Sequence, residues 1–158
     1  MERRNFLANY FPELQIKGLD NEVKLLFFEQ LCQSTSSWKE IKNKEVFTEL
    51  LNTLSADEKK ILDEAAPETF DLKTGKRPYR LDYSNGGGEV VLGVILQDLY
   101  EVKTHPKIVY GKHPVVIEIL APNRRPVQRT TDLPSFWHGA YPQIRKELAG
   151  RYPKHHWR

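Results

Sequence analysis

Apolar residues in the first third of the chain recur at intervals of three and four, which is the spacing of an amphipathic helix. Between residues 21 and 33 the apolar residues of one face are Val23, Leu26, Phe27 and Leu31. Asp20 or Asn21 stands just before them, where an N-cap is expected. The pattern therefore predicts a helix in this stretch.

Further helices are predicted before residue 67. Ser36 or Ser37 is followed by Glu40, and Ser55 is followed by Glu58. This is the spacing of a capping box, in which the Ser and Glu side chains satisfy backbone N–H groups of the first helical turn. Pro67 then ends the last helix, because the residue before a proline is disfavoured in helical conformation.

The period changes to two after Pro67. Phe70 and Leu72 alternate with polar residues before a turn at residues 74–76, and Tyr79 and Leu81 alternate with polar residues after it. This arrangement predicts a β-hairpin. The next apolar run, residues 89–101, fits one helical stripe, although its part from Val90 to Leu96 also fits a buried strand. We favour a helix there.

The rest of the chain predicts a short strand near residues 107–110, and a second hairpin of strands 115–120 and 127–131 around a Pro122–Asn123 turn. Asp132 can cap a helix that begins at Pro134, and residues 142–150 form another. The order predicts an α+β protein. It comprises an N-terminal helical unit (residues 1–66) and a small antiparallel β-sheet or oligonucleotide-binding (OB)-like barrel with a C-terminal helical tail (67–158).

Charge is distributed unevenly along the 158 residues. Residues 1–66 carry 9 Lys or Arg against 12 Asp or Glu, whereas residues 67–158 carry 15 against 9. The basic excess increases toward the C-terminus, where all five histidines also lie. Such a concentration is typical of a surface that meets phosphates. A solvated basic face without a ligand fits the charge equally well.

The sequence offers little for chemistry. The glycines of residues 86–88 lack the spacing of a nucleotide-binding loop, and neither P-loop nor dinucleotide-binding motifs occur. The histidines and the single Cys32 lack metal-ligand spacing, and no nucleophile motif is present. We therefore expect no cofactor, no metal and no enzymatic activity in the chain alone. A lone cysteine and the lack of any long apolar run favour a cytoplasmic protein without membrane contact.

The C-terminal tail combines aromatic and basic residues. Phe136, Trp137 and Tyr141 are expected to pack inward, while the aperiodic residues 151–157 are expected to lie over a surface. The segments "LDYS", "LQDLY" and "ILAPNRRPVQRTTDLPSFWHGAYPQIRKELAGRYPKHHW" resemble the C-terminal region of bacterial HrpB-type DExH-box ATP-dependent helicases. The matching residues of the ending are Asp132, Leu133, Phe136, Trp137, Gly139, Tyr141, Arg145, Lys146, Glu147, Gly150, Arg151, Tyr152, Pro153, Lys154, His155 and Trp157.

The resemblance covers residues 68–158 well and residues 1–66 only by position. Ile144 stands where the family more often has valine, and Arg158 stands where it usually continues with Pro and acidic residues. The resemblance implies a fragment or free-standing relative of an RNA-helicase-like enzyme. The chain would then be a non-catalytic accessory domain that contacts single-stranded nucleic acid, with RNA favoured, and the upstream ATPase lobes.

Charge, aromatic character and the resemblance together select the residues expected at a nucleic-acid surface. They are Arg124, Arg125, Arg129, Arg145, Lys146, Arg151, Tyr152, Lys154 and Trp157. Two other functions stay open at this stage. One is a protein-interaction module that docks on acidic surfaces, and the less favoured one is a small hydrolase that uses the histidines.

Overall fold

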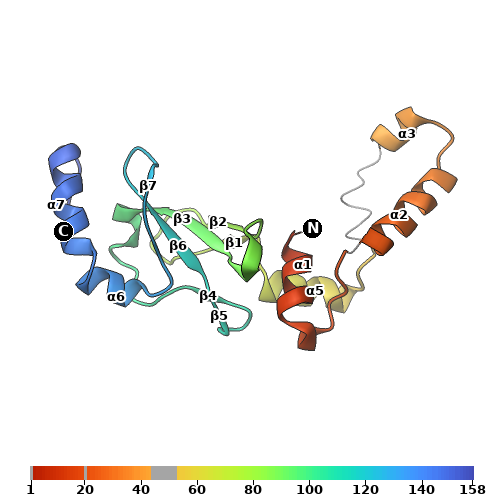
Figure 1. Cartoon of the computed structure of the whole chain (residues 1–158), viewed down its shortest axis with the longest axis horizontal. Helices are drawn as coiled ribbons and strands as arrows, with labels where there is room; N and C mark the ends of the chain where they lie inside the picture. Colours follow the sequence, from red (N-terminus) through yellow and green to blue (C-terminus); the bar gives the residue numbers. More distant parts are fainter. Residues whose placement is uncertain (1, 20, 44–52) are drawn as a thin grey trace. The chain divides into compact units, whose positions relative to one another are not determined.

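The computed structural model describes residues 2–19, 21–43 and 53–158. The chain forms two compact units, residues 1–66 and residues 67–158 (Figure 1). None of the helices within the described ranges combines the length and apolar content needed to cross a bilayer.

The first unit is helical. Its elements are α1 (Glu2–Tyr10), η1 (Pro12–Leu14), α2 (Asn21–Gln33), α3 (Trp38–Asn43) and α5 (Ala56–Ala65). Ser55 and Glu58 form a complete capping box at α5, as predicted. At α3 the hydroxyl of Ser37 accepts the Glu40 N–H at 3.3 Å. The helical expectation for residues 44–52, like Asp20 as a cap, lies outside the described residues.

Two arginines of α1 connect distant parts of the helical unit. The Arg3 guanidinium donates to the Ala66 carbonyl at 2.5 Å, past the end of α5, and pairs with Asp63 at 2.7 Å. Arg4 is only 3% exposed, and it donates to the Lys17 carbonyl and to the Thr53 hydroxyl. The Ala66 carbonyl is at the C-cap of α5 and lacks an intrahelical donor, so Arg3 supplies one. Arg4 instead connects the loop after η1 with Thr53.

The second unit is built on a five-stranded sheet with the order β1-β2-β3-β6-β7. The strands are β1 (Thr69–Phe70), β2 (Tyr79–Asp82), β3 (Val91–Ile95), β6 (Val116–Leu120) and β7 (Pro126–Thr130). Short 3₁₀ helices η2 (Gly86–Gly88) and η3 (Leu96–Leu99) flank β3. A separate small hairpin pairs β4 (Lys107–Ile108) with β5 (His113–Pro114). Helices α6 (Leu133–His138) and α7 (Tyr141–Arg151) follow.

Both predicted hairpins are confirmed. β1 pairs with β2 and β6 pairs with β7, each antiparallel. The helix favoured for residues 89–101 was wrong, because Val91–Ile95 is a strand and only Leu96–Leu99 turns into a short 3₁₀ helix. Val91, Leu92 and Val94 are buried and Gly93 is exposed, so β3 does not show the strict apolar and polar alternation by which a half-exposed strand is recognised.

The α+β class is confirmed, but the sheet is neither purely antiparallel nor a closed barrel. β3 and β6 run parallel, with Leu92 opposite Ile117 and Val94 opposite Ile119. Within the described residues β1 and β7 are the two edges and do not pair with each other. The parallel pair arises because residues 96–115 cross from the end of β3 back to the start of β6, so the chain enters both strands from the same side.

The core of the second unit lies on one face of this sheet. Leu92, Val94, Ile117 and Ile119 are completely buried. Their positions alternate along β3 and β6, so they point to the same face. α6 adds the buried side chains of Leu133 and Phe136 to the core. Asp132 caps α6 by accepting the Ser135 N–H at 3.2 Å, as predicted.

The C-terminal tail is fastened by an aromatic cluster of Tyr100, Phe136, Trp137 and Tyr141. The ring centroids of Trp137 and Tyr141 are 4.9 Å apart, and those of Phe136 and Trp137 are 5.1 Å apart. The Tyr141 hydroxyl donates to the Arg158 carbonyl at 2.5 Å. The Arg158 guanidinium pairs with Glu101 and lies 5.5 Å from the centre of the Tyr100 ring. These contacts hold the tail against the body of its unit.

Candidate nucleic-acid interface

A groove of about 620 Å³ lies between the β6–β7 hairpin and helix α7. We call it the hairpin–helix groove. The polar residues that line it are Asn123, Arg125, Gln128, Glu147, Arg151 and Tyr152, and the apolar ones are Ala121, Pro126, Val127, Ile144 and Leu148. Its two walls come from segments that the sequence places about twenty residues apart.

The hairpin wall is shaped by a tight turn. The Arg124 N–H donates to the Ala121 carbonyl at 2.8 Å, and the Ala121 N–H donates to the Arg125 carbonyl at 2.9 Å. The Asn123 side chain accepts the Arg125 N–H at 3.1 Å, a local bond for which Asn is favoured in turns. Arg124 carries the positive φ of 65° that the turn requires. The turn thereby fixes Arg125 at the rim of the groove.

The helical wall is set by the periodicity of α7. Leu148 is buried, while Glu147 and Arg151 lie one turn apart on the exposed side and form an ion pair of 3.1 Å. Both side chains are more than 60% exposed, so the pair contributes little to stability. In this pairing the Arg151 guanidinium lies beside Glu147 in the lining of the groove.

The structure brings three of the residues expected at a nucleic-acid surface into one lining: Arg125, Arg151 and Tyr152. Two cations and an aromatic ring in one groove are the components of single-strand binding. Cationic side chains follow the phosphates, and an aromatic ring stacks on a base.

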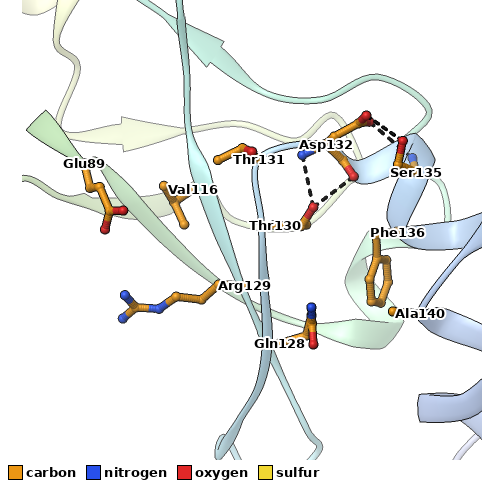
Figure 2. A pocket seen from close by; sticks show the side chains of 10 residues that line it. All are labelled: Glu89, Val116, Gln128, Arg129, Thr130, Thr131, Asp132, Ser135, Phe136 and Ala140. Carbon is orange, nitrogen blue, oxygen red and sulfur yellow. Dashed lines mark hydrogen bonds between the residues drawn. The ribbon is translucent and has the colours of Figure 1, made fainter.

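Arg129 is placed elsewhere. It lines a second pocket of about 470 Å³ that we call the edge pocket, together with Glu89, Val116, Gln128 and Phe136 among others. Figure 2 shows the lining side chains, with Glu89 and Phe136 on opposite sides of Arg129 and Gln128 in that view. The Arg129 guanidinium lies 2.7 Å from Glu118 on β6, and this carboxylate raises the pKa of Arg129. Its charge is therefore already compensated.

The remaining expected residues are distributed around the groove. Arg124 is exposed at the hairpin tip, and Lys146 and Lys154 are exposed outside both linings. None of these three has an ion-pair partner within the described part of the chain. Arg145 reaches the Trp157 carbonyl at 3.4 Å. Trp157 is half-buried and donates its indole N–H to the Tyr152 carbonyl at 3.0 Å. This bond ties the end of the chain to the C-cap of α7.

Sequence reasoning missed several side chains of these sites. Glu147 follows the i,i+4 rule with Arg151, a spacing that could have predicted their ion pair. Glu118 opposes Arg129 in the hairpin register, and the predicted Pro122–Asn123 turn was a signal for that pairing. Gln128 carried no signal, because its place in the groove depends on where α7 packs.

His105 is bonded to the backbone through both of its ring nitrogens. His105 Nε2 lies 2.7 Å from the Val115 carbonyl, and its Nδ1 lies 3.2 Å from the Leu133 nitrogen, so both ring nitrogens serve the fold. Burial lowers the pKa of His105 and of His113. In the described ranges no three His, Cys, Asp or Glu side chains gather as metal ligands.

The fold corresponds to a known class of helicase segment. The family model described as "ATP-dependent helicase C-terminal" matches residues 27–158. The chain belongs to this HrpB-type ATP-dependent helicase C-terminal family. The match begins within α2, so the similarity reaches into the helical unit as well as the sheet.

Individual relatives agree with this assignment. Over 154 residues the chain is 32% identical to the ATP-dependent RNA helicase HrpB of Escherichia coli strain K12, with 95% of this chain and 19% of that protein covered. A crystal structure of the E. coli DExH-box NTPase HrpB superposes with a TM-score of 0.86 at 31% identity, covering 99% of this chain and 20% of that one. A crystal structure of the E. coli DEAH/RHA helicase HrpB gives 0.75 at 30% identity, again over 99% and 20%. The chain thus spans about a fifth of the length of these relatives.

Proposed function

We propose that the chain serves as a non-catalytic accessory domain of an ATP-dependent RNA helicase, and that it contacts single-stranded RNA through the hairpin–helix groove. The observation that carries the proposal is the placement of Arg125, Arg151 and Tyr152 in one lining. Arg124 and Lys154, which have no ion-pair partner among the residues that the structure describes, add positive charge around it. RNA is favoured over DNA because the E. coli relative is named an RNA helicase.

The test is a fluorescence anisotropy titration of the 158-residue chain with labelled single-stranded RNA at several salt concentrations. Each phosphate contact contributes roughly 0.7 to the slope of log K against log salt for a single strand. Replacing Arg124, Arg125, Arg151 and Lys154 by Ala should flatten the slope and weaken binding. An Arg80→Ala variant removes one exposed charge from β2 outside both linings, and it is the control for the loss of a single charge, to be compared with Arg125→Ala alone.

An unchanged affinity and slope in the quadruple variant would contradict RNA binding at this surface. The second candidate would then take its place: a module that docks on acidic surfaces, including those of upstream helicase ATPase lobes. The exposed, unpaired Lys146, which lies outside both linings, favours that alternative.

The non-catalytic part of the proposal rests on the lack of nucleotide-binding motifs in the 158 residues. We expect the isolated chain neither to bind nor to hydrolyse ATP. Saturable ATP binding in equilibrium dialysis, or hydrolysis that survives repurification, would contradict this. We also place the protein in the cytoplasm, since its single cysteine fits a reducing compartment.

We further propose that the two compact units are separate domains, a helical domain of residues 1–66 and an α+β domain of residues 67–158. Each has its own buried apolar residues, with Leu7 and Leu62 in the first and Leu92 and Ile117 in the second. Expression of residues 67–158 alone should give a cooperatively unfolding protein. A chain that unfolds only as a single unit would contradict the division.

A further inference from the structure

We infer that the hairpin–helix groove selects an unpaired base that carries an exocyclic amino group, and that Glu147 sets this preference. The inference rests on the proposed function, because it requires that a single strand occupies the groove. It adds the identity of the base that the groove favours.

The groove contains two kinds of group: those that bind any single strand, and those that can distinguish one base from another. Arg125 and Arg151 are donors only and carry full positive charge, so the phosphates are their natural partners. The Tyr152 ring accepts any base by stacking, which is tolerant of sequence. These three side chains supply affinity without choosing between bases.

Base choice depends on the remaining polar groups of the lining. Asn123 and Gln128 end in amides, which can either donate or accept, so they can turn to suit most base edges. Glu147 ends in a carboxylate, which only accepts. Among the groove's described lining side chains, Glu147 is therefore the one that can only accept hydrogen bonds.

The Glu147 carboxylate lies in the groove lining, is paired with Arg151 and still has free acceptor positions. One carboxylate oxygen, Oε1, is held 3.1 Å from the guanidinium, and the Glu147 side chain remains 62% exposed. An ionised carboxylate has room for about four hydrogen bonds, so Oε2 and a further lone pair of Oε1 remain for a ligand. Tyr152 lines the same groove, so a base stacked on its ring enters the groove that Glu147 also lines.

The polarity of base edges decides the outcome. Cytosine presents an amino group at the position where uracil presents a carbonyl oxygen. An amino group donates to a carboxylate, whereas a carbonyl oxygen is repelled by it. The two pyrimidines have nearly the same size and stacking surface, so they differ at this site chiefly in hydrogen-bond polarity.

The experiment compares oligo(C) and oligo(U) RNA of about 12 nucleotides, a length within the usual single-strand site range. Binding of the 158-residue chain is followed by anisotropy at one salt concentration. We expect oligo(C) to bind at least about fivefold more tightly, as for one hydrogen bond to a charged acceptor that solvent partly screens. Glu147→Gln should reduce this ratio to below about twofold, mainly by strengthening oligo(U) binding, because the amide can donate to the uracil carbonyl.

The matched control is Glu89→Gln, which removes the same charge from the edge pocket and should leave the ratio unchanged. Equal binding of both oligomers by the unaltered chain would overturn the inference. It would also be overturned if Glu147→Gln strengthened both oligomers by the same factor, since that is the effect of charge alone. Lack of binding to either oligomer would instead overturn the proposed function, so the two failures are distinguishable. Circular dichroism of each variant confirms that the exposed substitutions leave the fold intact.

Discussion

The imidazole of His105 accepts a hydrogen bond from the backbone N–H of Leu133, with the two nitrogens 3.2 Å apart. Because Nδ1 is the acceptor, the proton of the neutral ring is on Nε2, which donates to the Val115 carbonyl at 2.7 Å. One ring therefore joins the loop before β4, the start of β6 and the first residue of α6. A second proton on this ring would face the Leu133 N–H and break that bond.

This geometry predicts that the second unit loses stability as the pH falls. Burial lowers the pKa of His105, opposed by the Val115 bond and by Asp132, and Lys107 lowers it further. The unfolded chain, with an ordinary pKa of about 6.5, binds a proton first on acidification. The free energy of unfolding should therefore decrease from about pH 7 downward, through the folded-state pKa.

The variant His105→Gln should make this decrease less steep in urea unfolding curves measured between about pH 5 and 8. It should also cost about 1 to 3 kcal/mol at pH 8, because the flexible Gln amide does not reproduce both backbone bonds of the rigid imidazole. Some pH dependence should remain, since burial lowers the pKa of His113 as well. His156→Gln, a change at an exposed histidine, is the control. A variant as pH-sensitive as the unaltered chain would refute this role of His105.

Tyr152 gives a prediction that separates stacking from charge. Tyr152→Ala should weaken single-stranded RNA binding by about 1 to 3 kcal/mol while leaving the salt slope almost unchanged. Tyr152→Phe should keep most of the affinity, because the ring remains. Anisotropy titrations at about 50 and 200 mM salt measure both quantities. If Tyr152→Ala flattened the salt slope and left the affinity unchanged, Tyr152 would act only by positioning Arg151.

Trp137 should govern the order of the C-terminal tail. Its ring packs against Tyr100, Phe136 and Tyr141 with centroids 4.9 to 5.9 Å apart. Trp137→Ala should cost about 2 kcal/mol, less than a fully buried aromatic because Trp137 is half-exposed. It should also raise hydrogen exchange in residues 152–158. Trp38→Ala, at a side chain 70% exposed in α3, should change stability by less than about 0.5 kcal/mol. Unchanged tail exchange in Trp137→Ala would count against the aromatic fastening.

Asp98 should anchor the turn of the first hairpin. Its carboxylate, 11% exposed, pairs with the Lys76 ammonium and accepts the Tyr79 hydroxyl at 2.6 Å. Burial raises the pKa of Tyr79, and the bond to Asp98 raises it further. Asp98→Ala should therefore cost about 1 to 3 kcal/mol in urea unfolding, since two polar groups lose their partner.

The control is Asp71→Ala, which removes a carboxylate that serves only its local neighbour Lys73 at an exposed turn. It should have an effect below about 1 kcal/mol. Equal costs for the two variants would show that Asp98 acts no differently from a surface carboxylate.

Local signals in the sequence were reliable where neighbours along the chain decide the structure. The Ser55 capping box and the Asp132 cap each involve residues three positions apart, and both are present. The two hairpins were predictable for the same reason, because a turn brings adjacent strands together.

The errors concern segments whose surroundings come from far along the chain. Val91–Ile95 has helical and strand periodicity at once, and its pairing with β6 decides in favour of the strand. The groove also depends on distant parts of the chain, because Arg125 and Arg151 share one lining only when α7 packs beside the hairpin. Arg129 lies outside the groove lining, because the hairpin register places it opposite Glu118, with which it forms an ion pair. Charge alone cannot distinguish these two arginines.

The parallel pairing of β3 with β6 has a consequence for how the second unit folds. The segment 96–115 must close as a loop before the central strands can meet, and its entropy is lost before their contacts form. Sheets that depend on such distant pairing fold more slowly than helical proteins. During synthesis, the apolar edge of β3 stays uncovered until β6 has left the ribosome. In that interval the nascent chain should be most prone to aggregation and most dependent on chaperones.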